Sequence, residues 1–511
     1  MNIMDMPPEM MLAIFQKLAP RDLKEAVLVC HSWKVFAENS PLWAWCIICI
    51  DNPKDLCKVE TKRAEKIESI WLEFMNPEEL NGVLKTLLKK LPNLKIIMGL
   101  EFQELSCIEP NILAKVVNKV ESVEWCFNTT MTSEQAQTVL FNMGQETNLK
   151  EMKMINRNLQ DIEPETLGLA LNNLQNLRIA NVPDVKTLTP EQVNGVFLVM
   201  SEGTKLKEVC LRDLNISQVE PMILASAARR LEELVIWRTF STENESELSD
   251  LQTKTLFNTL SKKTELKRLI ILAKNMINVD PRVLARALNN LEEVHLFDNM
   301  ITDLQSRTLL DMMSENTFLQ NLTIINNGLE TVQPNLLGGS LSQMKELILV
   351  NCRLTPEQTN SLFSSMKEKC KMTSLDISNN NLSSVNPEIL ASAVNTLTTI
   401  TMHNNHLTFG QVLSIFTQCA AKETRLKNLS IGNSKLTELD KELVAVALNN
   451  LEEVNLDECD MTGNQINSTL KLCMEKESKL MNLSFENQDL TGVDKELLRQ
   501  SSKKFSLLIE I

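Results

Sequence analysis

The sequence of 511 residues predicts an α/β protein in which a short helical domain precedes a long solenoid of strand–turn–helix units. Two observations predict the solenoid. An apolar pattern of the form L-x-x-L-x-L recurs every 25 to 35 residues from Leu149 onward, and a helix-start signal follows it in many units. A third observation predicts the helical domain, because the apolar residues near the N-terminus follow a helical period. Self-similar units of this length bury their apolar faces by stacking on one another.

The first 45 residues are predicted to be helical. Pro7 and Pro8 suit the first turn of a helix, where a missing amide hydrogen costs nothing. Arg21 and Asp22 then separate two apolar runs of helical spacing. The first run consists of Met10, Met11, Ile14, Phe15 and Leu18. About forty residues cannot bury so many large apolar side chains on their own. We therefore expect part of this surface to bind a partner.

The order of these residues resembles the F-box, whose pattern runs Leu-Pro-x-Glu, Ile-Phe, Leu, Asp-Leu, Val-Cys, Trp and Leu-Trp. Met6 stands where that family usually has Leu. The matching positions are Met6, Pro7, Glu9, Met10, Ile14, Leu18, Leu23, Val29, Cys30 and Trp33. The resemblance implies that these residues contact the Skp adaptor of an SCF (Skp–cullin–F-box) ubiquitin ligase or form the F-box core. It also implies that cullin and RING subunits join through the adaptor.

Residues 1–45 are thus expected to be an F-box, residues 46–66 a linker and N-terminal cap, and residues 67–511 a solenoid of about sixteen repeats. The unit starts lie at or near Ile67, Leu94, Val120, Leu149, Leu174, Leu206, Leu231, Leu266, Leu291, Leu319, Met344, Met372, Leu397, Leu426, Leu451, Leu480 and Phe505. From Leu149 onward, short units of 25 residues alternate with long units of 28 to 35 residues. This alternation resembles the ribonuclease-inhibitor-like class of leucine-rich repeats. The resemblance implies a parallel sheet on the concave face with helices outside.

Local signals within the units support the strand–turn–helix order. Strands show a period of two, so Leu375 and Ile377 should face the core while Asp376 and Ser378 face outward. Asparagines at the turns, which can satisfy neighbouring backbone groups, are Asn299, Asn327, Asn380 and Asn405. Thr189-Pro190-Glu191-Gln192 and Thr355-Pro356-Glu357-Gln358 are typical of helix starts with a capping box.

Composition excludes several classes of function. A net charge of −14 argues against broad nucleic-acid binding and against an anionic membrane surface. The N-terminus lacks the basic and apolar segments of a signal peptide. Cysteines such as Cys210, Cys352 and Cys459 lie inside Leu-rich patterns, which is typical of small buried apolar residues in a reducing compartment. We therefore expect a cytoplasmic or nuclear location.

The sequence offers no convincing catalytic or metal site. Its four histidines, at His31, His295, His403 and His406, have no triad or metal-ligand spacing with other residues. Gly338-Gly339 falls within a predicted helix and lacks the Lys-Ser/Thr of a phosphate loop. A metal site at Cys46, Cys49 and Cys57 is one interpretation, but a fourth ligand is missing and a core role is favoured. We expect no enzyme activity, no cofactor and no metal.

The outward side of the predicted sheet carries a row of large apolar side chains. Directly after the second strand leucine, consecutive units place Trp237, Leu272, Phe297, Ile325 and Val350. The neighbouring column adds Val235, Ile270 and Ile348. Five rungs about 4.8 Å apart make a ridge ~20 Å long on a face that should be wet. Either the ridge binds a protein substrate, or its side chains only pack laterally on one another.

Two further features leave alternatives open. The next column is rich in asparagine, from Asn326 through Asn433, and can either bind a ligand or finish the strand-to-turn transition. Insertions at 182–184 and 241–250 lengthen two units. They either stand beside a binding surface or are tolerated surface loops.

An F-box followed directly by leucine-rich repeats resembles the substrate receptors of SCF ligases. The resemblance implies docking on the Skp adaptor through the F-box and capture of a client protein on the repeats. A different hypothesis is a leucine-rich-repeat binding or inhibitor protein that acts without the ligase and keeps the F-box as an end cap. A third, an enzyme, is opposed by the missing catalytic residues.

Overall fold

The computed structural model describes residues 48–50, 56, 64–72, 75–100, 103–123, 131–154, 159, 161–180, 188–237, 248–271, 274–297, 300–315, 317–366, 370–421, 424–474 and 478–508. The chain divides into two compact units, residues 1–248 and residues 249–511, and each is considered by itself. The expected F-box, residues 1–45, lies outside the described residues.

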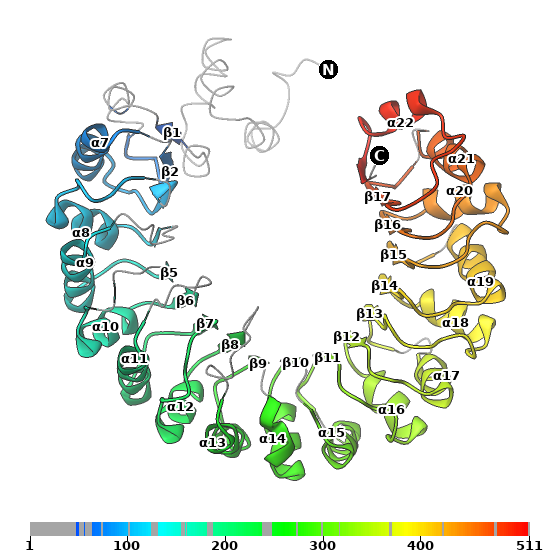
Figure 1. Cartoon of the computed structure of the whole chain (residues 1–511), viewed down its shortest axis with the longest axis horizontal. Coiled ribbons are helices and arrows are strands. Elements are labelled where there is room, and N and C mark those ends of the chain that lie inside the picture. Colours follow the sequence, from blue (N-terminus) through cyan, green and yellow to red (C-terminus); the bar gives the residue numbers. More distant parts are fainter. Residues whose placement is uncertain are drawn as a thin grey trace, which may run out of the picture. The chain divides into compact units, whose positions relative to one another are not determined.

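The first unit contains a parallel sheet in which each strand pairs with the next one along the chain. Its described strands are β1 (Ile48–Ile50), β2 (Ser69–Leu72), β3 (Ile96–Met98), β4 (Ser122–Val123), β5 (Glu151–Met154), β6 (Asn176–Ala180), β7 (Glu208–Arg212) and β8 (Glu233–Trp237). Its helices are α7 (Pro77–Lys90), α8 (Pro110–Lys119), α9 (Ser133–Gln145), α10 (Pro164–Asn172), α11 (Pro190–Glu202) and α12 (Pro221–Ala228). The helices follow the strands one by one and line one side of the sheet (Figure 1).

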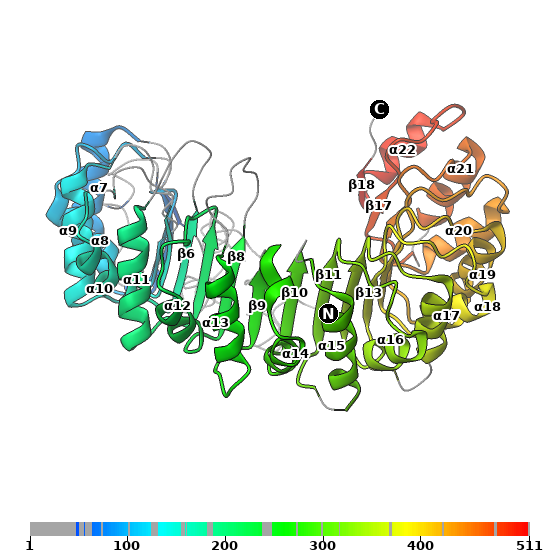
Figure 2. The same ribbon diagram turned by 60° about the horizontal axis from the view of Figure 1, so that its bottom comes forward.

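The second unit repeats this arrangement, again with every strand parallel to the next. Its described strands are β9 (Arg268–Ile271), β10 (Glu293–Phe297), β11 (Asn321–Ile325), β12 (Glu346–Val350), β13 (Ser374–Asp376), β14 (Thr399–Thr401), β15 (Asn428–Ser430), β16 (Glu453–Asn455), β17 (Asn482–Ser484) and β18 (Ser506–Leu508). Its helices are α13 (Asp250–Leu260), the 3-10 helix η4 (Lys274–Asn278), α14 (Pro281–Asn289), α15 (Asp303–Glu315), α16 (Pro334–Leu341), α17 (Pro356–Ser365), α18 (Pro387–Val394), α19 (Phe409–Ala420), α20 (Lys441–Asn449), α21 (Gly463–Cys473) and α22 (Lys495–Ser501). Figure 2 shows β9, β10 and β11 side by side, with α14 and α15 along one side of them.

The predicted α/β repeat fold is therefore confirmed in both units. The strand β1 lies within residues 46–66, the segment expected to be a linker and cap, and it pairs with β2 through Ile48 and Ile70. The sheet thus begins one strand earlier than the expected start of the solenoid at residue 67. The domain boundaries themselves remain predictions.

The core lies between the inner side of each sheet and its helices. Residues that begin the units, such as Leu174, Leu291 and Leu397, are fully buried. Leu375 and Ile377 face the core as predicted. Ser378 is predicted to face outward, but the structure buries it, with only 5% of its surface exposed. Its hydroxyl donates to Asp376 Oδ1 at 2.6 Å and accepts from the backbone N–H of His403 at 3.1 Å, so the next unit covers it.

The predicted capping boxes at Thr189 and Thr355 are both present. The glutamine of each box has a second role that joins successive repeats. Gln358 Nε2 donates to the carbonyls of Leu329 and Val332 in the preceding repeat, each at 2.7 Å, while its own side chain is completely buried. The same pair of bonds is made by Gln135, Gln192, Gln305, Gln411 and Gln465. The helix starts of these six long units are thereby tied to the turn before them.

Buried asparagines join the turns in a similar way, as expected for Asn327, Asn380 and Asn405. Asn380 Nδ2 donates to the carbonyls of Leu349 at 2.7 Å and Ile377 at 2.9 Å. Its Oδ1 accepts from the backbone N–H of Cys352 at 3.2 Å. One side chain therefore satisfies backbone groups in two repeats that would otherwise be buried without partners. Asn299 lies outside the described residues.

Candidate functional site

The outward face of each sheet carries the side chains that point away from the core. In β10 the buried residues Val294 and Leu296 alternate with Glu293, His295 and Phe297, which are partly exposed. The same alternation in β11 and β12 leaves Ile325 and Val350 partly exposed. The predicted register of these strands is therefore the register of the structure.

In the second unit, three of the predicted ridge residues form one continuous row. Phe297 pairs with Ile325 across β10 and β11, and Ile325 pairs with Val350 across β11 and β12. With strands about 4.8 Å apart, this row is ~10 Å long. Leu272 lies outside the described residues.

The neighbouring column of the second unit is not continuous. Ile270 and Ile348 are both partly exposed. Between them the register places His295 opposite Ile270 and Thr323 opposite Ile348. Thr323 is 4% exposed. The apolar surface of this column is thus interrupted by polar side chains.

Trp237 and Val235 belong to β8 of the first unit. Trp237 is partly exposed and pairs with Arg212. Val235 is only 9% exposed, although it shares the outward face with Trp237, so it offers little surface to a partner. Its neighbour on the adjacent strand is Cys210. The sequence predicts that Cys210 is buried in the core, but it lies on the outward face. Two small apolar side chains at paired positions cover one another.

A charged cluster stands beside the row and was not identified in the sequence. Arg268 Nε donates to Glu293 Oε1 at 2.9 Å, and His295 Nε2 lies 2.5 Å from the same oxygen. The imidazole of His295 stacks on the ring of Phe297. Burial by itself would raise the pKa of Glu293, but the hydrogen bond with His295 and the charge of Arg268 outweigh it and hold the pKa below its usual value. The alternation Glu293, His295, Phe297 was the signal that could have revealed the cluster.

Beyond β12 the outward face becomes polar. Ser430 Oγ lies 2.5 Å from His403 Nε2. Asp457 accepts from Ser484 Oγ at 2.6 Å and from Asn455 Nδ2 at 2.7 Å. The change from an apolar row to hydrogen-bonded side chains distinguishes two regions of this sheet face.

The asparagine column after the strands has a structural role. Asn326, Asn351, Asn379, Asn404 and Asn433 all have φ between 54° and 59°, in the left-handed region that Asn tolerates better than most residues. Their side chains bond to one another, with Asn351 Nδ2 donating to Asn326 Oδ1 at 2.8 Å and Asn433 Nδ2 donating to Asn404 Oδ1 at 2.8 Å. The column therefore turns the chain out of the sheet.

The pKa values of the buried cysteine thiols are set by their burial. Cys352, Cys419 and Cys459 are fully buried, and burial raises the pKa of each thiol to about 12. No group of three or more His, Cys, Asp or Glu in the described ranges is arranged to hold a metal ion. Of the three cysteines weighed as ligands, Cys46 and Cys57 lie outside the described residues, and only the backbone of Cys49 is described.

Several other predicted features lie outside the described residues. These are all the adaptor-binding positions from Met6 to Trp33, the insertion at 182–184, and the insertion at 241–250 apart from residues 248–250. In the part of the chain that the structure covers, no helix has both the length and the apolar character to cross a membrane.

Comparison with known proteins adds one strong finding. Residues 3–48 match the profile of the F-box-like family. No curated protein matches the chain. Similar solved structures include the TLR13–ssRNA13 complex, at 13% identity over 90% of this chain and 68% of that chain, with a TM-score of 0.41. They also include the Rad7–Elc1 complex in yeast, at 14% identity over 85% of this chain and 88% of that chain, with a TM-score of 0.41.

The match covers the N-terminal positions at which the residues resemble an F-box, and the strands and helices that follow alternate as they do in leucine-rich repeats. Residues 3–48 thus match an F-box-like domain, and each of the two units is built from leucine-rich-repeat-like alternation of parallel strands and helices.

Proposed function

We propose that this chain is the substrate-recognition subunit of an SCF-type E3 ubiquitin ligase. The observation that carries the proposal is the F-box-like match over residues 3–48, which runs directly into β1, the first described strand of the repeat sheet. In this arrangement the F-box docks on a Skp adaptor and the repeats hold a client protein. The adaptor brings cullin and RING subunits, and the location is cytoplasmic or nuclear.

The chain itself performs no covalent chemistry in this proposal. A ubiquitin-loaded enzyme recruited elsewhere in the complex reacts with a client that the repeats hold nearby, so the contribution of this chain is proximity. The adaptor-binding residues are Met6, Pro7, Glu9, Met10, Ile14, Leu18, Leu23, Val29, Cys30 and Trp33.

For the client, the proposed surface in the second unit is the row Phe297, Ile325 and Val350, flanked by Ile270 and Ile348. In the first unit it is Trp237. Partly exposed aromatic and aliphatic side chains in register supply the kind of anchors that dominate the free energy of protein interfaces. Val235 is too buried to contribute much, and Leu272 belongs to the proposal only by its sequence position.

The test is complex formation with a purified Skp adaptor. Replacing Pro7, Met10 and Leu18 together by charged residues should abolish the stoichiometric complex that the unaltered chain forms. The melting transition of the repeats should remain, because solenoid units are stabilised by their neighbours. A matched control carries Phe297→Ala, which should keep full adaptor binding. If the triple variant binds with unchanged affinity, or the unaltered chain forms no complex, the chain acts without the ligase and its F-box-like segment serves as an end cap.

A further inference from the structure

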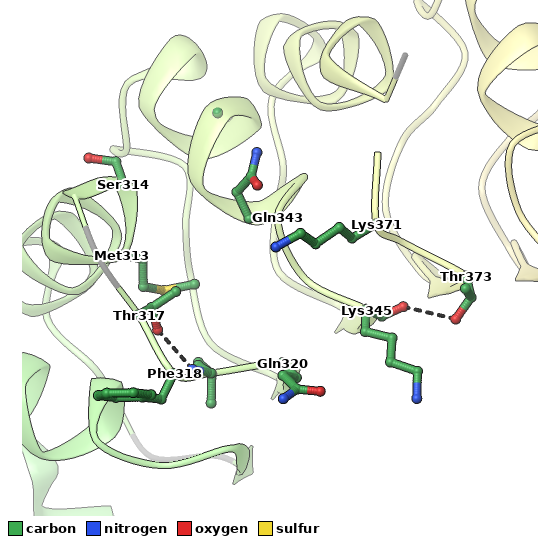
Figure 3. Close-up of a pocket in the computed structure, with 11 residues that line it drawn as sticks. Met313, Ser314, Thr317, Phe318, Gln320, Gln343, Lys345, Lys371 and Thr373 are labelled. Atoms are coloured by element: carbon green, nitrogen blue, oxygen red, sulfur yellow. Dashed lines mark hydrogen bonds between the residues drawn. The ribbon is translucent and has the colours of Figure 1, made fainter. Parts of the chain in front are cut away.

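An open depression of about 780 Å³ lies on the second unit, away from the outward face of the sheet. It lies at the starts of three consecutive strands, β11, β12 and β13, and residues of the helices α15 and α16 also line it. The residues that matter for the argument are Met313, Phe318, Gln320, Gln343, Lys345 and Lys371. Phe318 is 69% exposed, whereas Met313 is only 2% exposed. Figure 3 shows Lys371 extending toward Gln343 across this space.

The residues directly before the strands form a column, here named the strand-start column. It runs through Glu292, Gln320, Lys345, Thr373, Thr398, Lys427 and Glu452 in the second unit, joined by hydrogen bonds from backbone N–H to carbonyl. In the equivalent columns of the two units, four lysines form an ion pair with a glutamate of an adjacent repeat. These pairs are Lys95 with Glu68, Lys150 with Glu121, Lys207 with Glu232 and Lys427 with Glu452.

Lys345 has no glutamate neighbour of this kind. Its neighbours in the column are Gln320 and Thr373, which carry no charge. Lys371 lies two residues before Thr373 and faces the same depression. Neither lysine has an ion pair with any residue that the structure describes. The residues that line the depression therefore include two lysines and no acidic residue, in a chain of net charge −14.

The positions two residues before the column vary between repeats. In several repeats an asparagine at this position closes the end of the preceding helix, whereas others carry residues such as Lys205, Arg230 and Thr396. Asn290 Nδ2 donates to the Leu260 carbonyl at 3.1 Å, and Asn450 Nδ2 donates to the Cys419 carbonyl at 3.1 Å. Around the depression the three successive positions are held by Phe318, Gln343 and Lys371. These side chains make no such bond to described residues and line the space instead.

A glycine keeps one wall of the depression open. Gly339, on α16, would place a Cβ with no atom within 4 Å. The same position, five residues after the first residue of a short-unit helix, carries a side chain in the other short repeats: Lys115, Leu169, Ser226, Arg286, Ser392 and Val446. The fold therefore accommodates larger residues at this site, and a side chain placed there on α16 would extend into open space.

We propose that this depression binds an acidic peptide segment of a partner protein, with an apolar side chain against Phe318 and carboxylates at Lys345 and Lys371. Charge-assisted hydrogen bonds from lysine to carboxylate are among the stronger polar contacts available at a surface. Three strand starts span ~10 Å, which is the length of about three extended residues. This site is independent of the proposed ligase function and of the apolar row on the sheet face.

The experiment is selection of a random peptide library on the full chain, followed by binding measurements with the enriched peptides. We expect enrichment of peptides that combine Asp or Glu with an apolar residue. Their affinity should fall at least about tenfold in the double variant Lys345→Gln, Lys371→Gln, since loss of two charged contacts of ~0.7 kcal/mol each gives that factor. Gly339→Leu, which copies the residue of α10, should weaken binding by a similar factor by filling the space.

The matched control is Lys427→Gln, which removes a lysine of the same column that is already paired with Glu452 and should leave peptide affinity within about twofold. All these variants change exposed positions, and an unchanged melting transition verifies folding. Raised salt should weaken the acidic peptides. Enrichment of basic or uncharged peptides, failure to enrich any peptide, or equal affinity for the unaltered chain and both variants would overturn the proposal.

Discussion

The imidazole of His295 stacks on the ring of Phe297, with the ring centroids 6.2 Å apart and the planes inclined by 16°. Both side chains leave the same strand on its outward face, and His295 also lies 2.5 Å from Glu293. Phe297 is therefore held by its own strand before any partner arrives. A pre-positioned aromatic ring loses little conformational entropy on binding, which favours its use as an anchor.

The first prediction concerns this anchor. Phe297→Ala should weaken client capture at least about tenfold, because a truncated hot spot costs ~2 kcal/mol. Trp237→Ala should act similarly in the first unit. Tm should change little, because both side chains lie on the face opposite the core. Client capture is measured by pull-down and Tm by calorimetry. Retained capture with a large fall in Tm would mean that these rings stabilise the sheet and do not bind clients.

The second prediction concerns pH. The folded pKa of Glu293 is lowered, so its ionised form stabilises the fold above the usual glutamate pKa, and this stabilisation is lost as pH falls through the lowered value. Glu293→Gln should therefore lower Tm near neutral pH, and the difference from the unaltered chain should shrink as pH drops below about 4. The exposed Glu357→Gln serves as the control and should show a smaller pH-dependent difference. A Glu293→Gln difference that stays constant with pH would contradict the linkage.

The third prediction concerns the hydrogen bonds by which Gln358 and its equivalents join successive repeats, here named the glutamine bridges. Gln358→Ala removes two hydrogen bonds to the carbonyls of Leu329 and Val332 and one from the backbone N–H of Thr355. Leaving these buried groups without partners should cost about 2–4 kcal/mol of unfolding free energy. Denaturant unfolding measures the loss, and hydrogen exchange should localise it to the 329–332 turn. Glu357→Ala, one residue away and exposed, should cost less than about 1 kcal/mol.

The fourth prediction concerns the left-handed turns. Asn404 has φ of 54°, a conformation that a β-branched residue adopts only with strain. Asn404→Val should lower the unfolding free energy by about 1–2 kcal/mol more than Asn404→Gly, since glycine accepts this φ freely. Denaturant unfolding of the two variants supplies the comparison. Equal stability of the valine and glycine variants would show that the backbone conformation is not the constraint.

The fifth prediction concerns thiol reactivity. Cys107 is exposed, whereas burial raises the pKa of Cys352, Cys419 and Cys459 to about 12. The thiolate is the reactive form, so an alkylating reagent near neutral pH should label Cys107 first and the three buried thiols only on unfolding. Mass spectrometry of the labelled peptides distinguishes the sites. Rapid labelling of Cys352 in the folded chain would contradict its burial.

The repeat fold could be predicted because its signals are local. Alternation places Leu375 and Ile377 in the core wherever the strand begins, and Thr355 with Gln358 marks a helix start without knowledge of the neighbours. What the sequence did not reveal depends on the register between repeats. The burial of Ser378 comes from a bond to the backbone of His403, 25 residues away, and the second role of Gln358 depends on carbonyls in the preceding turn.

The candidate site likewise has one part that the sequence predicts and another part that it does not. The row Phe297, Ile325 and Val350 follows from period-two alternation and parallel stacking, both of which the sequence contains. The low exposure of Val235 does not, because it depends on which side chains stand at paired positions of the next strand. The depression around Phe318 and Lys345 was missed because its lining residues come from three successive repeats, which only the structure brings together.

The glutamine bridges also say what the unit of duplication is. Among the described residues they occur at the starts of six long-unit helices, and Gln305, Gln358 and Gln411 follow one another at intervals of 53 residues. Each bridge needs a short repeat immediately upstream. Gain or loss of a single repeat would therefore leave a buried glutamine without the two carbonyls that accept its hydrogen bonds. Such a chain can lengthen or shorten only in steps of two repeats, which makes the pair, and not the single leucine-rich unit, the natural cassette for recombination and for engineering.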